Sequence, residues 1–216
     1  MELYKISSSL DHTLKNTDLQ SVASGLSEVL LDSLLENGII KDIPIVGTIV
    51  GSAKTIVGIR ETLFLKKVLS FIIELKDVPA SERKEMIDQI DKSKKYRVKV
   101  GEKLLYIIDR CADHEKSEIA GRLFLAFLKD IISYDDFLRT VNAVEKVLPS
   151  DIHYFVEHDF DGYWAVDAEQ YINSGLVSLD LYFEDDYKAV PVNSPELKVQ
   201  LSDIGMKLKK ALIGAI

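Results

Sequence analysis

Cys111 and His114 are the residues of this sequence closest to a nucleophile and its base. They stand three positions apart in "DRCADHEKSE", so one helical turn would place the thiol beside the imidazole. No second histidine or asparagine is placed to complete such a site. A small buried cysteine at a junction between helices, with an aspartate as cap, explains the same residues. We therefore favour a structural role for this cysteine.

The segment "HYFVEHDFDGYW" contains the one cluster of histidines and carboxylates that could bind a metal ion. His153 and His158 are five positions apart, so they diverge on a helix and do not form the i, i+4 pair that binds zinc. "EHDFDG" matches the first positions of a calcium loop. However, Ala168 occupies the twelfth position, which requires a bidentate glutamate. A solvated acidic loop fits better, and we predict no metal site.

Glycines and a lysine occur together in "GTIVGSAKT", where a phosphate-binding loop could be sought. Gly47, Gly51, Lys54 and Thr55 lack the adjacent Gly-Lys-Ser/Thr that such a loop requires. With no nucleophile, metal or phosphate motif complete, the sequence predicts a protein that is not an enzyme. We expect no catalytic residues, no metal and no cofactor.

The same stretch belongs to the least polar part of the chain, Ile43 to Ile59, in which Lys54 is the one charged residue. As a helix it would span about 25 Å, less than the roughly 30 Å of a bilayer core, and Lys54 adds a further cost. A permanent transmembrane helix is therefore disfavoured. We expect a central helix of a bundle, in which Gly47, Gly51 and Gly58 lie close to one stripe and let a neighbouring helix approach.

A second apolar segment, "TLFLKKVLSFIIEL", follows directly, and amphipathic helices flank the pair in the sequence. This arrangement resembles the logic of pore-forming colicin domains and related cell-death effectors, soluble proteins that hide an apolar hairpin until it is triggered. The resemblance implies an alternative for residues 43–75, a hairpin that leaves the core to meet a membrane or a partner.

One basic cluster stands out, made of Lys92, Lys94, Lys95, Arg97, Lys99 and Lys103 and diluted by Glu102. Such cations could contact anionic lipid or a nucleic acid. Tyr96 is the one aromatic residue among them, so stacking on single strands has no support. A solvated helix face is the commoner explanation of a charge run.

Hydrophobic periodicity predicts the elements that carry these residues. Residues 1–16 show no sustained period and are expected to form a loose N-terminal arm. Apolar residues spaced three and four apart predict an all-α bundle of six or seven helices over residues 17–149. In residues 150–216, "LVSLDLYFE" alternates like a half-buried strand, and "YKAVPV" and "LKVQL" can supply partner strands. The fold class is mainly α, a multi-helix bundle with a small C-terminal α+β module.

Capping residues mark the ends of the predicted helices. The first helix opens with Thr17 and Gln20 in capping-box spacing and stops at Asn37-Gly38, and Ser133 with Asp136 forms a second box. Gly175 and Ser202 are expected to cap later helices, and Pro149 ends the bundle. The apolar region from 43 to 75 fits one long helix or two that break near Gly58.

The order of elements near the C-terminus resembles the end of winged-helix modules. In these, "GL" leads into a wing and a Leu-Thr-x-x-Gly turn begins the last helix, and the corresponding residues here are Gly175-Leu176 and Leu201-Ser202-Asp203-Ile204-Gly205. The resemblance covers about the last 45 residues and implies a fold rather than a function. Acidic residues stand in "DAEQYINSG" and "YFEDDYK", where a DNA-reading member would carry basic ones. This departure from the pattern favours a module that packs on the helical part of the chain or on a protein partner.

The N-terminal arrangement "NGIIKDIPIVGTIVG" followed by "FLKKVLSFI" is similar to uncharacterised bacterial helical proteins, some of them associated with phage defence. The resemblance implies a bacterial protein and a place in defence. It identifies no catalytic or binding residue in this chain.

Charge is divided unevenly along the 216 residues, whose net charge is −8. Residues 151–216 contain five basic and twelve acidic residues, a net charge of −7, which disfavours contact of this region with nucleic acid. The single cysteine and the absence of a signal-peptide pattern favour the cytoplasm. We predict an effector or partner-binding protein, recruited to the inner membrane in one scenario, that self-associates or binds a protein. The alternative is a winged-helix regulator acting on nucleic acid.

Overall fold

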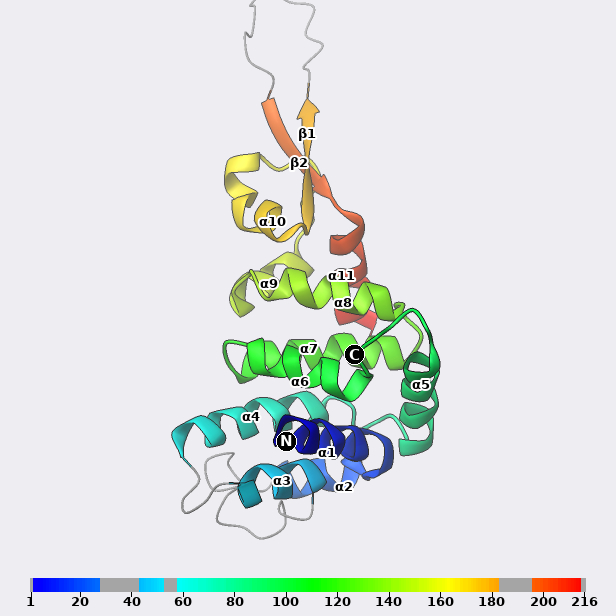
Figure 1. The fold of residues 1–216 in the computed structure, drawn as a ribbon. Helices are drawn as coiled ribbons and strands as arrows, with labels where there is room; N and C mark the ends of the chain where they lie inside the picture. The colour runs from blue at the N-terminus through cyan, green and yellow to red at the C-terminus, as the bar shows by residue number, and fades with distance from the viewer. Residues whose placement is uncertain (1, 28–42, 53–57, 183–195, 215–216) are drawn as a thin grey trace, which may run out of the picture. The chain divides into compact units, whose positions relative to one another are not determined.

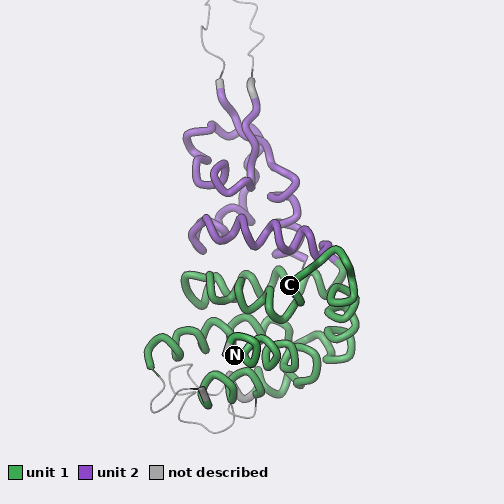
Figure 2. The backbone as a smooth tube through the Cα atoms, in the orientation of Figure 1, with its two compact units in different colours: residues 1–130 green, residues 131–216 purple. Residues whose placement is uncertain are grey.

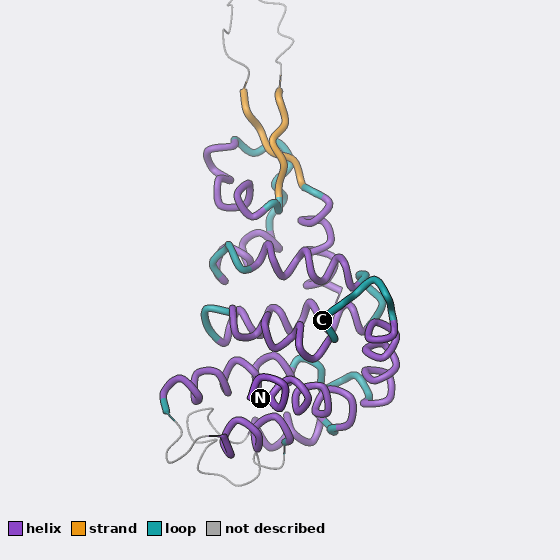
Figure 3. The backbone as a smooth tube through the Cα atoms, in the orientation of Figure 1, coloured by secondary structure: helices purple, strands orange, loops and turns teal. Residues whose placement is uncertain are grey.

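Eleven α-helices, a short 3-10 helix and two strands make up the described part of this chain (Figure 1). The structure, a computed structural model, describes residues 2–27, 43–52, 58–182 and 196–214. The predicted mainly α fold with a small α+β module is confirmed (Figure 3). In chain order the elements are α1 (Glu2–Asn16), α2 (Leu19–Ser27), α3 (Pro44–Ser52), α4 (Ile59–Ile73), α5 (Ala80–Lys92), α6 (Val100–Arg110), α7 (His114–Leu128), α8 (Tyr134–Val144), α9 (Pro149–Glu157), η3 (Ala165–Ala168), α10 (Glu169–Ser174), β1 (Val177–Tyr182), β2 (Glu196–Leu201) and α11 (Asp203–Gly214).

Two compact units divide the chain, residues 1–130 and residues 131–216 (Figure 2). The sequence placed the boundary near residue 149, because α8 reads like the helices before it. In the structure α8 and α9 both pack against α11, so they belong to the second unit. Pro149 accordingly begins α9 at its first helical position, where a missing N–H costs nothing.

α1 replaces the loose arm predicted for residues 1–16, and that prediction is wrong. Leu10 and Leu14 are completely buried, and α1 packs against α3, α5 and α6. Ile6, Leu10 and Leu14 follow one another at four-residue spacing, which is a helical face. This apolar face has few residues, and the serines between them made the helical periodicity hard to recognise in the sequence.

The start of the next helix also differs from the prediction. Asp18, not Thr17, is the capping residue of α2, because its carboxylate accepts hydrogen bonds from the backbone N–H groups of Gln20 at 3.1 Å and Ser21 at 3.3 Å. Leu19 is buried as predicted. The remainder of the predicted helix and its Asn37-Gly38 stop lie outside the described residues.

Two glycines of the first unit lie where helices cross. A Cβ added to Gly101 in α6 would lie 2.8 Å from the Asp11 Cβ of α1, and one added to Gly121 in α7 would lie 2.7 Å from the Phe71 carbonyl oxygen of α4. Each backbone is therefore closer to its neighbour than any other residue type allows. The pairs α1 with α6 and α4 with α7 define the packing of this unit.

Arg83 is the largest polar side chain in the interior of the first unit, with 1% of its surface exposed. Its guanidinium donates to the Leu14 carbonyl at 2.7 Å and to the Thr17 carbonyl at 2.5 Å, both at the end of α1. It also donates to the carbonyls of Val78 and Leu75 in the turn after α4. Burial lowers the pKa of this group. Arg83 thus donates hydrogen bonds to backbone carbonyls near the ends of two helices.

The second unit is built on well-capped helices. Ser133 and Asp136 form the predicted capping box of α8, with the Ser133 Oγ accepting from the Asp136 N–H at 3.1 Å. Its core includes the rings of Phe155, Phe160 and Tyr171, whose centroids lie 4.7 to 5.1 Å apart. Gly175 ends α10 with a φ of 83°, the left-handed conformation predicted for a glycine cap.

The strands form a small antiparallel sheet. β1 pairs with β2 in the register Val177 to Leu201 and Tyr182 to Glu196, which confirms "LVSLDLYFE" and "LKVQL" as partner strands. The other predicted strand, "YKAVPV", lies outside the described residues.

A short third segment joins the sheet on the far side of β2. Gly162, with a φ of 83°, donates to the Val199 carbonyl at 2.9 Å, and the Val199 N–H donates to the Tyr163 carbonyl at 2.9 Å. This pattern is a G1 bulge, in which glycine takes the left-handed position. Trp164 then bridges to Lys198, whose ammonium lies 5.1 Å from the indole ring. Residues 162–164 are therefore held at the edge of the sheet.

The turn from β2 into α11 uses the predicted Ser202 cap. The Ser202 Oγ accepts from the Gly205 N–H at 3.0 Å and lies 2.7 Å from the Gly175 carbonyl oxygen. A Cβ at Gly205 would overlap the Leu176 carbonyl oxygen. The glycine of the Leu201 to Gly205 motif is therefore required by contact with the segment that precedes β1.

Candidate functional site

Cys111 and His114 lie at two consecutive helix ends. Cys111 is buried immediately after α6, and its thiol donates to the Ile107 carbonyl at 3.3 Å. His114 is the exposed first residue of α7, whose N-cap is Asp113. The geometry is that of a helix junction, the role that the sequence favoured.

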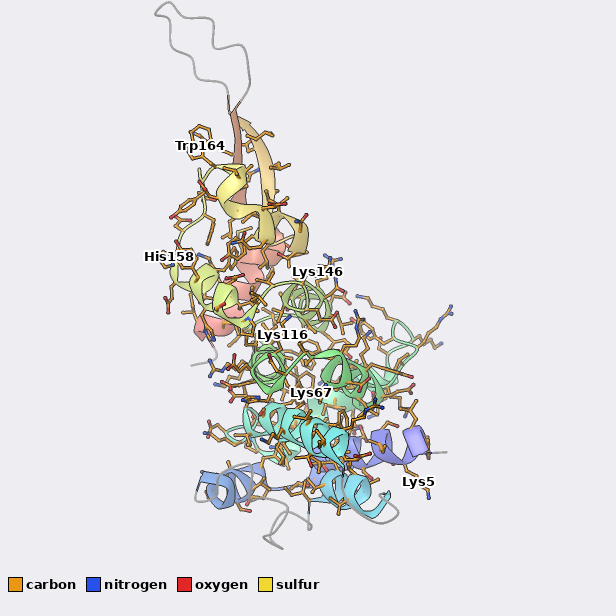
Figure 4. The ribbon with its side chains drawn as sticks, turned by 90° about the vertical axis from the view of Figure 1, so that its left-hand side faces the viewer. Lys5, Lys67, Lys116, Lys146, His158 and Trp164 are labelled. Carbon is orange, nitrogen blue, oxygen red and sulfur yellow. The ribbon has the colours of Figure 1, made fainter. Side chains whose placement is uncertain are left out.

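The acidic segment around His158 is used for local structure. The His158 Nδ1 lies 2.9 Å from the Tyr154 carbonyl oxygen, and the two rings stack at 3.8 Å (Figure 4). Asp161 accepts from the Leu201 N–H at 2.9 Å and so ties this loop to β2. No group of three or more histidine, cysteine or acidic residues in the described ranges is arranged to hold a metal ion.

α3, which contains Gly47 and Gly51, is not the central helix that was expected. α3 lies beside α1 and packs mainly against it (Figure 1). Ile45, Val46 and Ile49 are buried, while Gly51 is exposed. This nine-residue, mostly apolar helix therefore has one side turned away from α1. The physical reason is that α1, absent from the prediction, takes the central place.

Gly51 and Gly58, two glycines of the apolar stretch, do not show the close helix packing that was predicted. A Cβ built on Gly51 meets nothing within 4 Å. Gly58 is the N-cap residue of α4, and a Cβ there would meet the carboxylate of Glu61, a side chain that can move. Gly47 is half-buried within α3, and Lys54 lies outside the described residues. Of the two alternatives, one long helix or two that break near Gly58, the start of α4 at Ile59 with Gly58 as its N-cap favours the second.

Replacing Gly51 by alanine is expected to raise the free energy of unfolding by about 0.5–1 kcal/mol. Alanine has the higher helix propensity, and the position has room for a methyl group. Urea unfolding followed by circular dichroism would measure the change. Gly121→Ala is the matched control and is expected to destabilise, so a loss of stability in Gly51→Ala would contradict the geometry described above.

Polar contacts fasten α3 to α1. The hydroxyls of Ser9 and Thr48 lie 2.6 Å apart, and the Ile45 N–H at the start of α3 donates to the Thr13 Oγ1 at 3.2 Å. Thr13 is fully buried and also donates to the Ser9 carbonyl at 2.8 Å. The hydroxyls of α1 therefore hold the first turn of α3 in place.

The start of α4 carries apolar side chains on its surface. Ile59 is 81% exposed and Leu63, one turn later, is 55% exposed, with Arg60 between them also at the surface. Neither residue was predicted to lie at the surface, because the whole apolar region was expected to be buried in the bundle. Their i, i+4 spacing beside Arg60, Lys66 and Lys67 was the available signal.

A groove of about 350 Å³ runs beside this surface. Lys67 fixes one of its walls, because its ammonium donates to the carbonyls of Asp109 at 2.7 Å and Cys111 at 2.9 Å, at the end of α6 (Figure 4). The groove is lined by both apolar and charged side chains. Its lining residues are Arg60, Leu63, Phe64, Lys66, Lys67, Asp109, Ala112, Asp113 and His114.

The basic cluster lies on the connection between α5 and α6 rather than on one helix face. Five of its members are exposed and Lys103 is half-buried. Lys92 ends α5 and Lys103 lies in the first turn of α6, so the structure brings all six onto one connection. The lysines and the arginine that the sequence grouped are therefore neighbours in the fold.

A network of one lysine and three carboxylates supports the base of this connection. The Lys15 ammonium lies 3.0 Å from Asp11, 2.9 Å from Asp88 and 3.0 Å from Asp91. Burial alone would lower the pKa of Lys15, but its hydrogen bonds to these carboxylates raise that pKa above its usual value. The hydrogen bond from Lys15 lowers the pKa of the Asp88 carboxyl. The network joins α1 to α5.

Replacing Asp88 by asparagine is expected to lower the free energy of unfolding at pH 7 by less than about 1 kcal/mol, since the pair is partly exposed. A carboxyl whose pKa is lower in the folded state than in the unfolded state stabilises the folded protein at pH values above the unfolded-state pKa of about 3.9. This stabilisation is lost as the pH falls through the folded-state pKa. The difference between wild type and variant should therefore vanish in strong acid. Urea titrations at neutral and acid pH would measure it, with the exposed Asp77→Asn as control. If the difference in free energy of unfolding between wild type and Asp88→Asn does not depend on pH, Asp88 does not form a stabilising ion pair with Lys15.

No described helix is both long and apolar enough to cross a membrane. Comparisons of the chain with protein-family models, with curated proteins and with solved structures found no match.

Proposed function

We propose that this chain is a non-enzymatic effector or partner-binding protein whose α3–α4 hairpin meets a membrane or a protein partner when it acts. The observation that carries the proposal is the exposure of Ile59 and Leu63 at the start of α4, beside the cations of Arg60, Lys66 and Lys67. Exposed apolar side chains flanked by cations are typical of helices that enter the membrane interface.

The contact surface grows if α3 leaves α1. The polar part of the α1–α3 interface described above consists of the Ser9–Thr48 contact and the Thr13–Ile45 hydrogen bond, to which buried aliphatic side chains are added. Separation would add Ile45 and Ile49 to the exposed Ile59 and Leu63. The hairpin then presents one apolar surface on two helices.

The lengths of the two helices favour contact along a membrane surface. α3 has nine residues and α4 fifteen, which correspond to about 14 Å and 23 Å, against roughly 30 Å for a bilayer core. Helices of these lengths lie in the interface, where Arg60 and Lys66 reach the headgroups. Disturbance of lipid packing is the expected consequence.

Leakage of a trapped dye from vesicles that contain phosphatidylglycerol tests the membrane branch of the proposal. The wild-type chain is expected to release dye, and Ile59→Glu with Leu63→Glu is expected to abolish release without loss of the folded state, because both side chains are already exposed. Tyr106→Glu, at a similarly exposed position on α6, is the matched control and should leak like wild type.

A gel-shift titration at low salt separates this proposal from a regulator that acts on nucleic acid. In the sheet, β2 lies between β1 and residues 162–164, and this order supports the winged-helix resemblance. The exposed Glu169 and Asp180, however, repel phosphate. Salt-sensitive DNA binding together with an absence of leakage and of any bound protein partner would overturn the proposal.

The similarity of the N-terminal part to bacterial proteins associated with phage defence supports a cellular test. Bacteria that express the chain are expected to survive phage challenge better than those that express Ile59→Glu with Leu63→Glu. Equal survival of bacteria that express the wild-type chain and of those that express the variant would contradict a role of this surface in defence.

A further inference from the structure

We propose that the basic cluster on the α5–α6 connection is a preformed docking surface for the anionic headgroups of a phospholipid bilayer. The cluster comprises Lys92, Lys94, Lys95, Arg97, Lys99 and Lys103. This inference rests on the membrane branch of the proposed function and adds a recruiting surface that is separate from the α3–α4 hairpin.

The connection is fastened at both ends. The Asp91 carboxylate, at the end of α5, accepts from the Val100 N–H at 2.8 Å at the start of α6 and also pairs with Lys15 at 3.0 Å. Inside the connection the Ser93 N–H donates to the Ile90 carbonyl at 3.0 Å, and the Lys95 N–H donates to the Ser93 Oγ at 3.3 Å. The backbone that carries the cations is therefore ordered before any ligand binds, which lowers the entropic cost of binding.

The charge of the cluster is concentrated. Residues 92–103 contain six basic side chains and one acidic side chain, Glu102, a net charge of +5 in a chain whose total is −8. Asp11, Asp88 and Asp91, which lie on the neighbouring α1 and α5, are paired with Lys15. The cluster is thus a local positive surface on an acidic protein, and it complements a surface of negative headgroups.

The residues between the cations favour lipid over nucleic acid. Val98 is 40% exposed, so an aliphatic side chain stands among the lysines, where it can enter the headgroup region. The Lys95 ammonium lies over the Tyr96 ring, 5.2 Å from its centroid, and covers a face on which a base would stack. A bilayer surface needs cations and apolar atoms but no free aromatic face.

Co-sedimentation of the full chain with vesicles tests the inference. Wild type is expected to bind vesicles of phosphatidylcholine mixed with phosphatidylglycerol and not vesicles of phosphatidylcholine alone. The variant Lys94→Gln, Lys95→Gln, Arg97→Gln should bind the anionic vesicles about 100-fold more weakly, because each cation near an anionic surface contributes about fivefold. The matched control is Lys5→Gln, Lys76→Gln, Lys84→Gln, which removes the same charge from exposed positions elsewhere in the unit and should bind almost as wild type does.

Three outcomes would overturn the inference. They are equal loss of binding in the two triple variants, full binding by the Lys94, Lys95 and Arg97 variant, and tighter binding of wild type to DNA or RNA than to anionic vesicles in the same salt. Thermal unfolding of every variant, expected to match wild type, confirms that folded proteins are compared.

Dye release in the same vesicles distinguishes this inference from the proposed function. Binding by wild type without release would remove the hairpin proposal and leave the docking surface standing. Release by wild type that is equally strong in the Lys94, Lys95 and Arg97 variant, with unchanged binding, would remove the docking surface alone.

Discussion

Replacing Arg83 by alanine is expected to lower the free energy of unfolding by about 3–5 kcal/mol, since the donors of buried carbonyls are lost together with the side chain. The carbonyls of Leu14, Thr17, Leu75 and Val78 all accept from this guanidinium. In the alanine variant these four carbonyls lose the hydrogen bonds that the guanidinium donates. Urea unfolding followed by circular dichroism measures the loss.

The neighbouring Lys84→Ala is the matched control, because this lysine is exposed on the same helix. It should change stability by no more than about 0.5 kcal/mol. Arg83→Lys is expected to fall between the two, since an ammonium cannot reach carbonyls on both sides as the planar guanidinium does. Equal stability of Arg83→Ala and Lys84→Ala would show that Arg83 does not hold the two helix ends together.

Replacing Gly205 by alanine is expected to destabilise the second unit by about 2–3 kcal/mol, because the new methyl group would overlap the Leu176 carbonyl oxygen and force backbone movement. Leu201 lies on the other side, with its Cδ1 3.0 Å from the position of the new atom. The chain contains a single tryptophan, Trp164, in this unit. The fluorescence of Trp164 during urea unfolding therefore reports on the unfolding of the second unit.

Gly214→Ala in the same helix is the control. A Cβ there meets the Ile131 side chain at 3.6 Å, an ordinary contact distance. Its effect should stay within about 0.5 kcal/mol. If Gly205→Ala unfolds at the same urea concentration as Gly214→Ala, the close approach between α11 and the residues before β1 does not exist.

Local signals in the sequence predicted much of the fold. The capping box at Ser133 and Asp136, the left-handed Gly175 and the Ser202 cap depend on residues within a few positions of one another, and all are present in the structure. The alternation in "LVSLDLYFE" likewise predicted β1. What failed was α1, where three apolar residues at four-residue spacing were too few to show a period among serines.

The candidate site was harder to predict because it depends on contacts between distant segments. Gly51 and Gly121 are both helical glycines in the sequence, yet only the second faces a neighbouring backbone. Arg83 is buried because its guanidinium binds carbonyls at two helix ends. One is the end of α1, 60 or more positions before it in the sequence, and the other is the turn after α4, a few positions before it. The sequence offered a helix break near Gly58 as one of two alternatives, whereas the exposure of Ile59 required knowledge of which side of α4 packs on α7.

The packing of α1 against α3 has a consequence for synthesis. The ribosome makes α1 before α3, and domains generally fold as the N-terminal part emerges. The helix that covers Ile45, Val46 and Ile49 is therefore already outside the ribosome when these residues appear. The apolar side chains of α3 can therefore be covered by α1 as soon as they are synthesised, before the rest of the unit has been made.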